Sequence, residues 1–92
     1  MTTTQTERIP ALRGLPTTLP REGAIEIELE QGVLIFRVSN AVQERIEKLL
    51  DQQREANLTA EEELELEQYE EVDDYLSFVN RLSRNVVQSQ QE

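Results

Sequence analysis

Residues 58–85 constrain the fold of this chain more than any other stretch, because they form one continuous helical pattern with two unlike halves. The pattern opens with Thr59 and Glu62, which fit a capping box in which each side chain satisfies the other residue's backbone amide. Carboxylates in the first turn also lie favourably at the positive end of the helix dipole. We therefore predict a helix over residues 60–86, followed by a frayed tail over residues 87–92.

The first half of this predicted helix is acidic and carries no compensating base. Nine acidic residues and no basic residue occur in this run: Glu61, Glu62, Glu63, Glu65, Glu67, Glu70, Glu71, Asp73 and Asp74. Because the run contains no base, pairing within it cannot neutralise these charges. Like charges four residues apart also mildly destabilise a helix. We predict that an acidic face made of Glu63, Glu67, Glu70, Glu71 and Asp74 binds a basic partner. The alternative is that this face is only solvated surface.

The second half of the helix is apolar over an arc of about 180° at 100° per residue. This arc is wider than the stripe that one antiparallel neighbour needs. One seam, made of Val72, Leu76, Val79 and Val86, can pack on the rest of the chain. A second seam contains Tyr75, Phe78 and Leu82 and is a candidate surface for self-association or for a partner. The alternative is that both seams are internal.

Residues 24–38 predict a β-hairpin. Residues 24–30 alternate between apolar and acidic side chains, residues 33–38 are rich in β-branched and aromatic types, and Gln31-Gly32 suits a two-residue turn. The turn sets a register in which paired residue numbers sum to 63: Ile25 with Val38, Ile27 with Phe36, and Leu29 with Leu34.

A two-stranded hairpin is not stable alone, so we expect the face formed by these three pairs to cover the helices. Val33 and Ile35 then lie on the outer face and are a further candidate docking surface.

Residues 41–56 predict a shorter helix, preceded by Asn40 and Gln43 in the spacing of a capping box. Its apolar stripe includes Val42, Ile46 and Leu49, and nothing in it indicates chemistry.

Residues 1–23 contain three prolines and show no apolar periodicity, which predicts a flexible arm. The arm carries a charge of +1, from three Arg and two Glu, and the alternative is that it orders on a partner.

Composition excludes several classes of function. The net charge of −10 over 92 residues opposes non-specific binding to nucleic acids and anionic membranes, which depends on Lys and Arg. The chain has no Cys or His, and its acids are not set in a calcium-binding loop or a paired-carboxylate cleft. We expect no enzyme activity, no metal, no cofactor and a cytoplasmic location. So small a core also favours a homodimer or a protein partner.

Two segments resemble a known kind of protein: residues 36–50, from Phe36-Arg37-Val38-Ser39 to Leu49-Leu50, and residues 58–81, which contain Leu58-Thr59-Ala60-Glu61 and Tyr69-Glu70-Glu71-Val72. They are similar to small acidic proteins common in cyanobacteria and related bacteria. Those proteins are often encoded beside a small HNH-type or PIN-type nuclease and are antitoxin-like. The resemblance covers roughly residues 24–85 and implies a role, but it assigns no functional residues.

The sequence thus predicts an α+β fold in which a β-hairpin packs on an antiparallel pair of helices over residues 24–86. The expected function is a non-enzymatic, antitoxin-like protein-binding module that neutralises or regulates a basic partner such as a small nuclease. One alternative is a structural subunit of a larger assembly. Another is a DNA-binding autoregulator, which is poorly supported because Arg37 alone on the strand offers too few donors to read bases.

Overall fold

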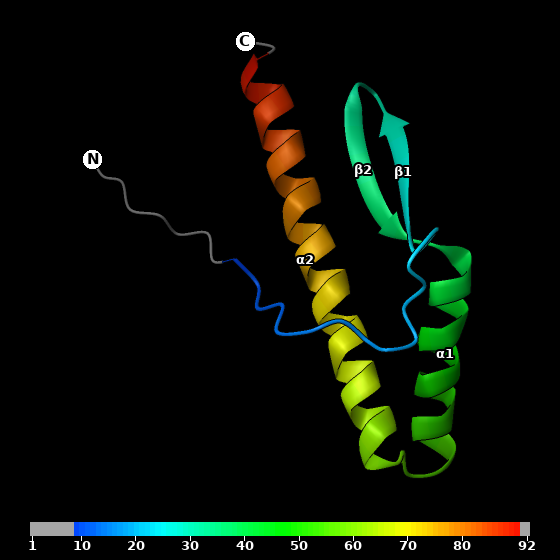
Figure 1. Cartoon of the computed structure of the whole chain (residues 1–92). Helices are drawn as coiled ribbons and strands as arrows, with labels where there is room; N and C mark the ends of the chain where they lie inside the picture. The colour runs from blue at the N-terminus through cyan, green and yellow to red at the C-terminus, as the bar shows by residue number, and fades with distance from the viewer. Residues whose placement is uncertain (1–8, 91–92) are drawn as a thin grey trace.

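In the computed structural model, which describes residues 9–90, a β-hairpin is followed by two antiparallel helices (Figure 1). The elements are β1 (Ile25–Glu30), β2 (Val33–Val38), α1 (Asn40–Glu55) and α2 (Ala60–Gln90). α1 packs beside the first half of α2, and β2 packs beside the second half, so the long helix supports both other units. The predicted α+β fold is confirmed.

The hairpin has the predicted register at all six pairs of residues, from Ile25 with Val38 to Glu30 with Val33. Gln31 and Gly32 form the turn with φ values of 51° and 83°. Positive φ at both turn positions is the geometry of a type I′ turn, which matches the twist of the two strands.

The helix starts depend on local capping contacts. At α2, the backbone N–H of Glu62 donates to Thr59 Oγ1 at 3.1 Å and that of Thr59 donates to Glu62 Oε1 at 3.0 Å, which confirms the predicted capping box. At α1 the capping residue is Ser39, whose hydroxyl oxygen accepts from the Val42 amide, so the prediction of Asn40 was wrong by one residue. α2 continues to Gln90, beyond the predicted end at residue 86, and residues 91 and 92 lie outside the described part.

The core lies between the two helices and the base of the hairpin. Tyr69, Leu49 and Val42 are its most completely buried large side chains. The buried residues that form this cluster are Ala24, Val38, Val42, Leu49, Leu58, Leu66, Tyr69 and Val72. The turn end of the hairpin contributes nothing to this cluster, so it extends away from the core along α2.

The hairpin contacts α2 through β2 and not through the predicted face. Asn80 of α2 hydrogen-bonds the backbone of Phe36: the Phe36 N–H donates to Oδ1, and Nδ2 donates to the Phe36 carbonyl, both at 2.8 Å. The helix therefore lies along the edge of β2, and Figure 1 shows β2 between α2 and β1. Ile35, predicted to be outside, is only 5% exposed, whereas Ile27 is 61% exposed. The predicted inner and outer faces were thus wrong along most of the hairpin.

The described part of the N-terminal arm, residues 9–23, contacts the helices and crosses α2 in Figure 1. The Arg13 backbone N–H and Nε donate to the carboxylate of Glu71 at 3.1 and 3.0 Å. Pro16 is buried, and Leu19 packs against the core. This part of the predicted flexible arm is therefore held by its own chain, while residues 1–8 of that prediction lie outside the described residues.

Candidate protein-binding surface

A continuous apolar surface remains exposed on the hairpin. Its four residues, which we name the hairpin face, are Ile25, Ile27, Leu29 and Leu34, and their side chains share one side of the sheet through the cross-strand pairing. Leu29 and Leu34 are 71% and 51% exposed, although they are opposite each other in the ladder. Strand residues of this type are normally covered, because a hairpin gains stability by burying one apolar face. The hairpin face is therefore available to another molecule.

The hairpin face continues onto α2 across a shallow groove of about 410 Å³. Leu34 lines the groove from the hairpin side, and Val79, Leu82 and Val86 line it from the helix. Leu82 and Val86 are themselves exposed. A contiguous apolar patch of this kind on a small protein is typical of a protein interaction site.

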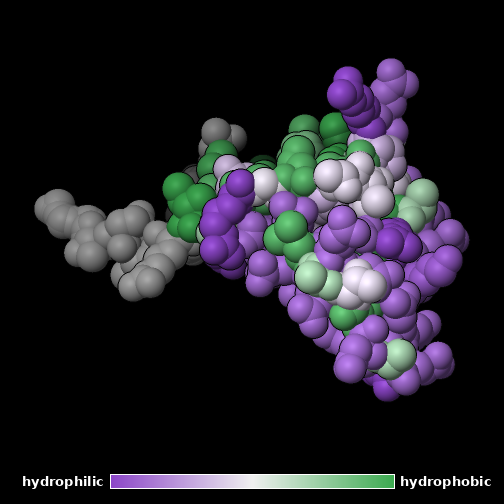
Figure 2. Space-filling model, turned by 60° about the horizontal axis from the view of Figure 1, so that its bottom comes forward, coloured by the Kyte–Doolittle hydropathy of each residue, from purple (hydrophilic) through white to green (hydrophobic). Residues whose placement is uncertain are grey.

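The end of the molecule where α1 joins α2 has a different surface. Figure 2 shows that this end is covered mostly by hydrophilic residues, with hydrophobic residues gathered in the upper part of the view. The exposed acids Glu63, Glu67, Glu70 and Asp74 recur three or four residues apart on α2, so they form one stripe along the helix. The structure thus retains four of the five residues of the predicted acidic face as exposed surface.

Glu71, the fifth residue predicted for that face, is not free. Its side chain is 14% exposed and is held by Arg13 of the arm. The side-chain and backbone hydrogen bonds from Arg13 hold the pKa of the Glu71 carboxyl below its ordinary value. Glu71 therefore attaches the arm to α2, and the prediction that it belongs to an open binding face was wrong.

Glu65 has a similar structural role, which the sequence did not indicate. Nε and Nη2 of Arg45 in α1 donate to its two carboxylate oxygens, each at 2.8 Å, and Thr18 of the arm also donates to it. The hydrogen bond from Arg45 lowers the pKa of Glu65, although burial acts in the opposite direction. The bases that neutralise part of the acidic run thus come from other segments, so inspection of α2 alone could not find them.

The predicted apolar docking residues are only partly accessible. Leu82 is exposed and belongs to the groove, whereas Val33 and Tyr75 are half-buried. Phe78 is 7% exposed, its ring centroid lies 6.5 Å from that of Tyr75, and it is buried like Ile35. Phe78 and Ile35 therefore cannot serve as open docking residues. The residues that the sequence did not point to are those of the hairpin face, because the position of α2 at the edge of β2 depends on contacts such as that of Asn80 with Phe36, which lies 44 residues away.

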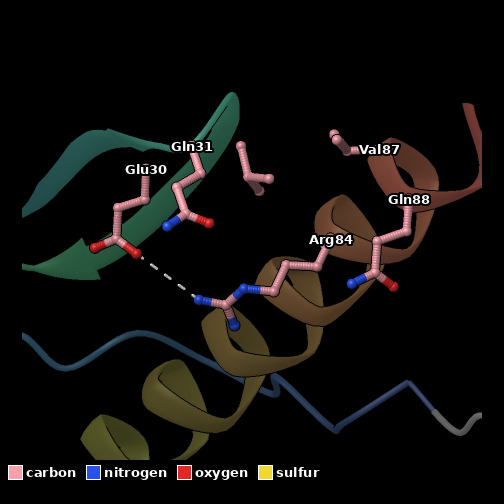
Figure 3. A pocket seen from close by; sticks show the side chains of 6 residues that line it. Glu30, Gln31, Arg84, Val87 and Gln88 are labelled. Carbon is pink, nitrogen blue, oxygen red and sulfur yellow. Dashed lines mark ion pairs between the residues drawn. The ribbon is translucent and has the colours of Figure 1, made fainter. Parts of the chain in front are cut away.

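The opposite side of the hairpin is acidic and partly paired. Arg37 lies 2.9 Å from a carboxylate oxygen of Glu28 and 3.4 Å from one of Glu30. Arg84 of α2 approaches Glu30 at 3.9 Å, across an open cavity of about 540 Å³ beside the hairpin turn (Figure 3). Arg84, which lines this cavity, already faces Glu30, so the described residues of the cavity offer no unpaired basic side chain to an anion.

No other chemistry is evident within residues 9–90. That part of the chain contains no group of three or more acidic side chains placed to hold a metal ion. None of its helices is sufficiently long and apolar to cross a membrane.

Comparison of the chain with models of protein families, with curated proteins and with solved structures found no match.

Proposed function

We propose that this protein is a non-enzymatic binding module that acts by contact with a basic protein partner. The observation that carries the proposal is the exposed hairpin face, where Leu29 is 71% exposed although it belongs to the alternating apolar positions of β1. Burial of such side chains is the main favourable term in protein association. The exposed acidic stripe on α2 adds a charge that attracts a basic partner and speeds its docking.

The specific form that we propose is antitoxin-like: the protein neutralises or regulates a small nuclease in the cytoplasm. A nuclease holds phosphate with a basic groove, and an acidic helix competes for such a groove. The resemblance of residues 24–85 to small acidic proteins encoded beside nucleases supports this form. A homodimer is also part of the proposal, and sedimentation of the isolated chain tests it.

A genetic experiment tests the antitoxin form. Deletion of the gene in a cell that retains an intact neighbouring nuclease gene is expected to arrest growth, and expression of the chain in trans is expected to restore it. Normal growth after the deletion contradicts this form of the proposal.

The surfaces are tested by variants expressed in the same rescue assay. Reversal of charge at Glu63, Glu67 and Glu70 to Lys is expected to reduce rescue. A matched reversal at the exposed α1 residues Glu44, Glu47 and Glu55 changes the net charge equally and is expected to preserve it. If both triple variants rescue growth equally, the acidic stripe is not a binding surface.

A structural subunit of a larger assembly is the second candidate, because the same apolar surface also suits a permanent interface. Apolar contacts survive high salt, whereas screening weakens contacts between exposed charges. Stoichiometric co-purification with a large complex in 1 M salt supports the subunit. A partner held mainly by the hairpin face also stays bound in this salt, so recovery of a single small partner in place of a large complex is the result that supports the regulator.

A further inference from the structure

We propose that the free edge of β1 binds an extended segment of the basic partner, which adds a third, antiparallel strand to the hairpin. The segment alternates apolar residues with Lys or Arg. This inference rests on the proposed function, since it names the chemistry by which that partner is recognised. Strand addition at a sheet edge is a common way to bind a peptide, in which the main chain supplies affinity and alternate side chains supply specificity.

The backbone groups of β1 point alternately toward β2 and toward the open edge of the sheet. In an antiparallel pair, residues alternate between positions that exchange both hydrogen bonds and positions that exchange none. The Ser39 N–H donates to the Ala24 carbonyl at 2.8 Å, and both backbone groups of Phe36 point away from β1 toward Asn80. Phe36 pairs with Ile27, so the backbone groups of Ile27 also point away from the ladder, at the free edge.

By the same alternation, the N–H and C=O groups of Ile25, Ile27 and Leu29 all lie along the outer edge of β1. No hydrogen bond from elsewhere in residues 9–90 reaches them. Figure 1 shows β1 as the strand farther from α2, so the helix does not cover this edge. The edge therefore presents three donors and three acceptors in the spacing that another strand requires.

The two sides of β1 favour different side chains on an added strand. Residues of the added strand that lie opposite Ile25, Ile27 and Leu29 would extend the hairpin face, so apolar side chains are favoured there. Residues opposite Glu26, Glu28 and Glu30 would lie on the acidic side. Among the described residues, the ion pairs of these acids are those of Arg37 with Glu28 and Glu30 and that of Arg84 with Glu30. Glu26 forms no ion pair with a described residue. Cross-strand pairs of opposite charge are stabilising, so Lys or Arg is favoured at these positions.

The same charges disfavour a second copy of the chain at this edge. An antiparallel β1–β1 pair that keeps its apolar residues on one face must place Glu opposite Glu on the other. Directly opposed like charges destabilise a sheet, and charged residues on edge strands commonly prevent such self-pairing. A strand that carries Lys or Arg at these positions places opposite charges across from the Glu residues, which stabilises the pair.

The test uses the full chain and a capped nine-residue peptide of alternating Val and Lys, followed by amide hydrogen exchange. We expect the peptide to slow exchange at the amides of Ile25, Ile27 and Leu29 by at least about tenfold, the effect of one added hydrogen bond of ordinary strength. The inward amides of Glu26 and Glu28 are already in the ladder and serve as internal controls. A bound peptide that leaves the three outward amides unchanged overturns the proposal, and so does equal affinity for a Val–Glu peptide.

Two variants at one residue separate the edge from the face. Ile27→Pro removes an outward N–H without removing a ladder hydrogen bond, and we expect affinity for the Val–Lys peptide to fall on the order of a hundredfold. Ile27→Thr keeps the N–H and a β-branched side chain, and we expect a loss of about fivefold or less. Equal losses contradict pairing at the edge. The protected amide of Glu28 verifies that each variant retains the hairpin.

Failure of this inference is distinguishable from failure of the proposed function. If Leu29→Thr and Leu34→Thr abolish rescue from the nuclease while Ile27→Pro does not, the protein binds its partner through the hairpin face and not through the edge. If none of these variants affects rescue, the proposed use of the hairpin fails as well.

Discussion

Asn80 is the contact on which the position of the hairpin depends, and Asn80→Ala is the most informative change to stability. The variant removes two hydrogen bonds of 2.8 Å to the half-buried backbone of Phe36. Each such bond contributes about 1 kcal/mol net, and an unsatisfied buried group costs more, so we expect a loss of about 2 kcal/mol. For a domain of this size that corresponds to a fall in Tm of about 10 °C.

The assay is urea denaturation of the full chain, with Asn85→Ala as the matched control. Asn85 is exposed on the same helix, so both variants share the gain in helix propensity from Asn to Ala. The difference between the two free energies of unfolding then isolates the contact with β2. The Phe36 amide should also exchange faster in Asn80→Ala. A difference below about 0.5 kcal/mol refutes the reasoning that the helix holds the edge of β2.

Three further predictions concern the helices and the arm. Because the folded-state pKa of Glu65 is lowered, its contribution to stability is present above its unfolded pKa of about 4.3 and is lost as pH falls through the folded value. Arg45→Gln should therefore reduce the loss of the free energy of unfolding as pH falls through this range. An unchanged slope of this free energy against pH contradicts the ion pair. Thr59→Ala should cost about 1 kcal/mol in urea denaturation by removing the α2 cap, and a neutral result contradicts the capping role. Arg13→Ala should move the pKa of Glu71 up toward its ordinary value by NMR titration, and no movement contradicts the contact of arm and helix.

The hairpin register and the start of α2 were predictable because their determinants are local. Gln31-Gly32 set the turn, alternation set the pairs, and Thr59 with Glu62 lie three residues apart. Each of these signals lies within one segment of the chain. The same locality explains the small error at α1, where Ser39 and Asn40 are adjacent residues that both suit a helix cap.

The faces of the hairpin were not predictable in the same way. Both sides of β2 carry large apolar residues, so periodicity alone does not decide which side is covered. The choice depends on packing against α2, whose Asn80 bonds the backbone of Phe36 from 44 residues away in the sequence. Likewise, Glu65 and Glu71 are neutralised by Arg45 and Arg13, at separations of 20 and 58 residues. Contacts across such distances decide which parts of an acidic or apolar pattern remain open for binding.

The central claim is that the hairpin face is open in the isolated chain, and the free energies of unfolding of Leu29→Thr and Ile35→Thr test it most directly. Leu29 is 71% exposed and Ile35 is 5% exposed, although both lie in the hairpin. We predict that Leu29→Thr changes stability by less than about 0.5 kcal/mol, as is usual for surface changes, and that Ile35→Thr costs at least about 2 kcal/mol. The reverse order, with Leu29→Thr the more destabilising variant, would show that the hairpin face is buried and would contradict its role as the binding surface.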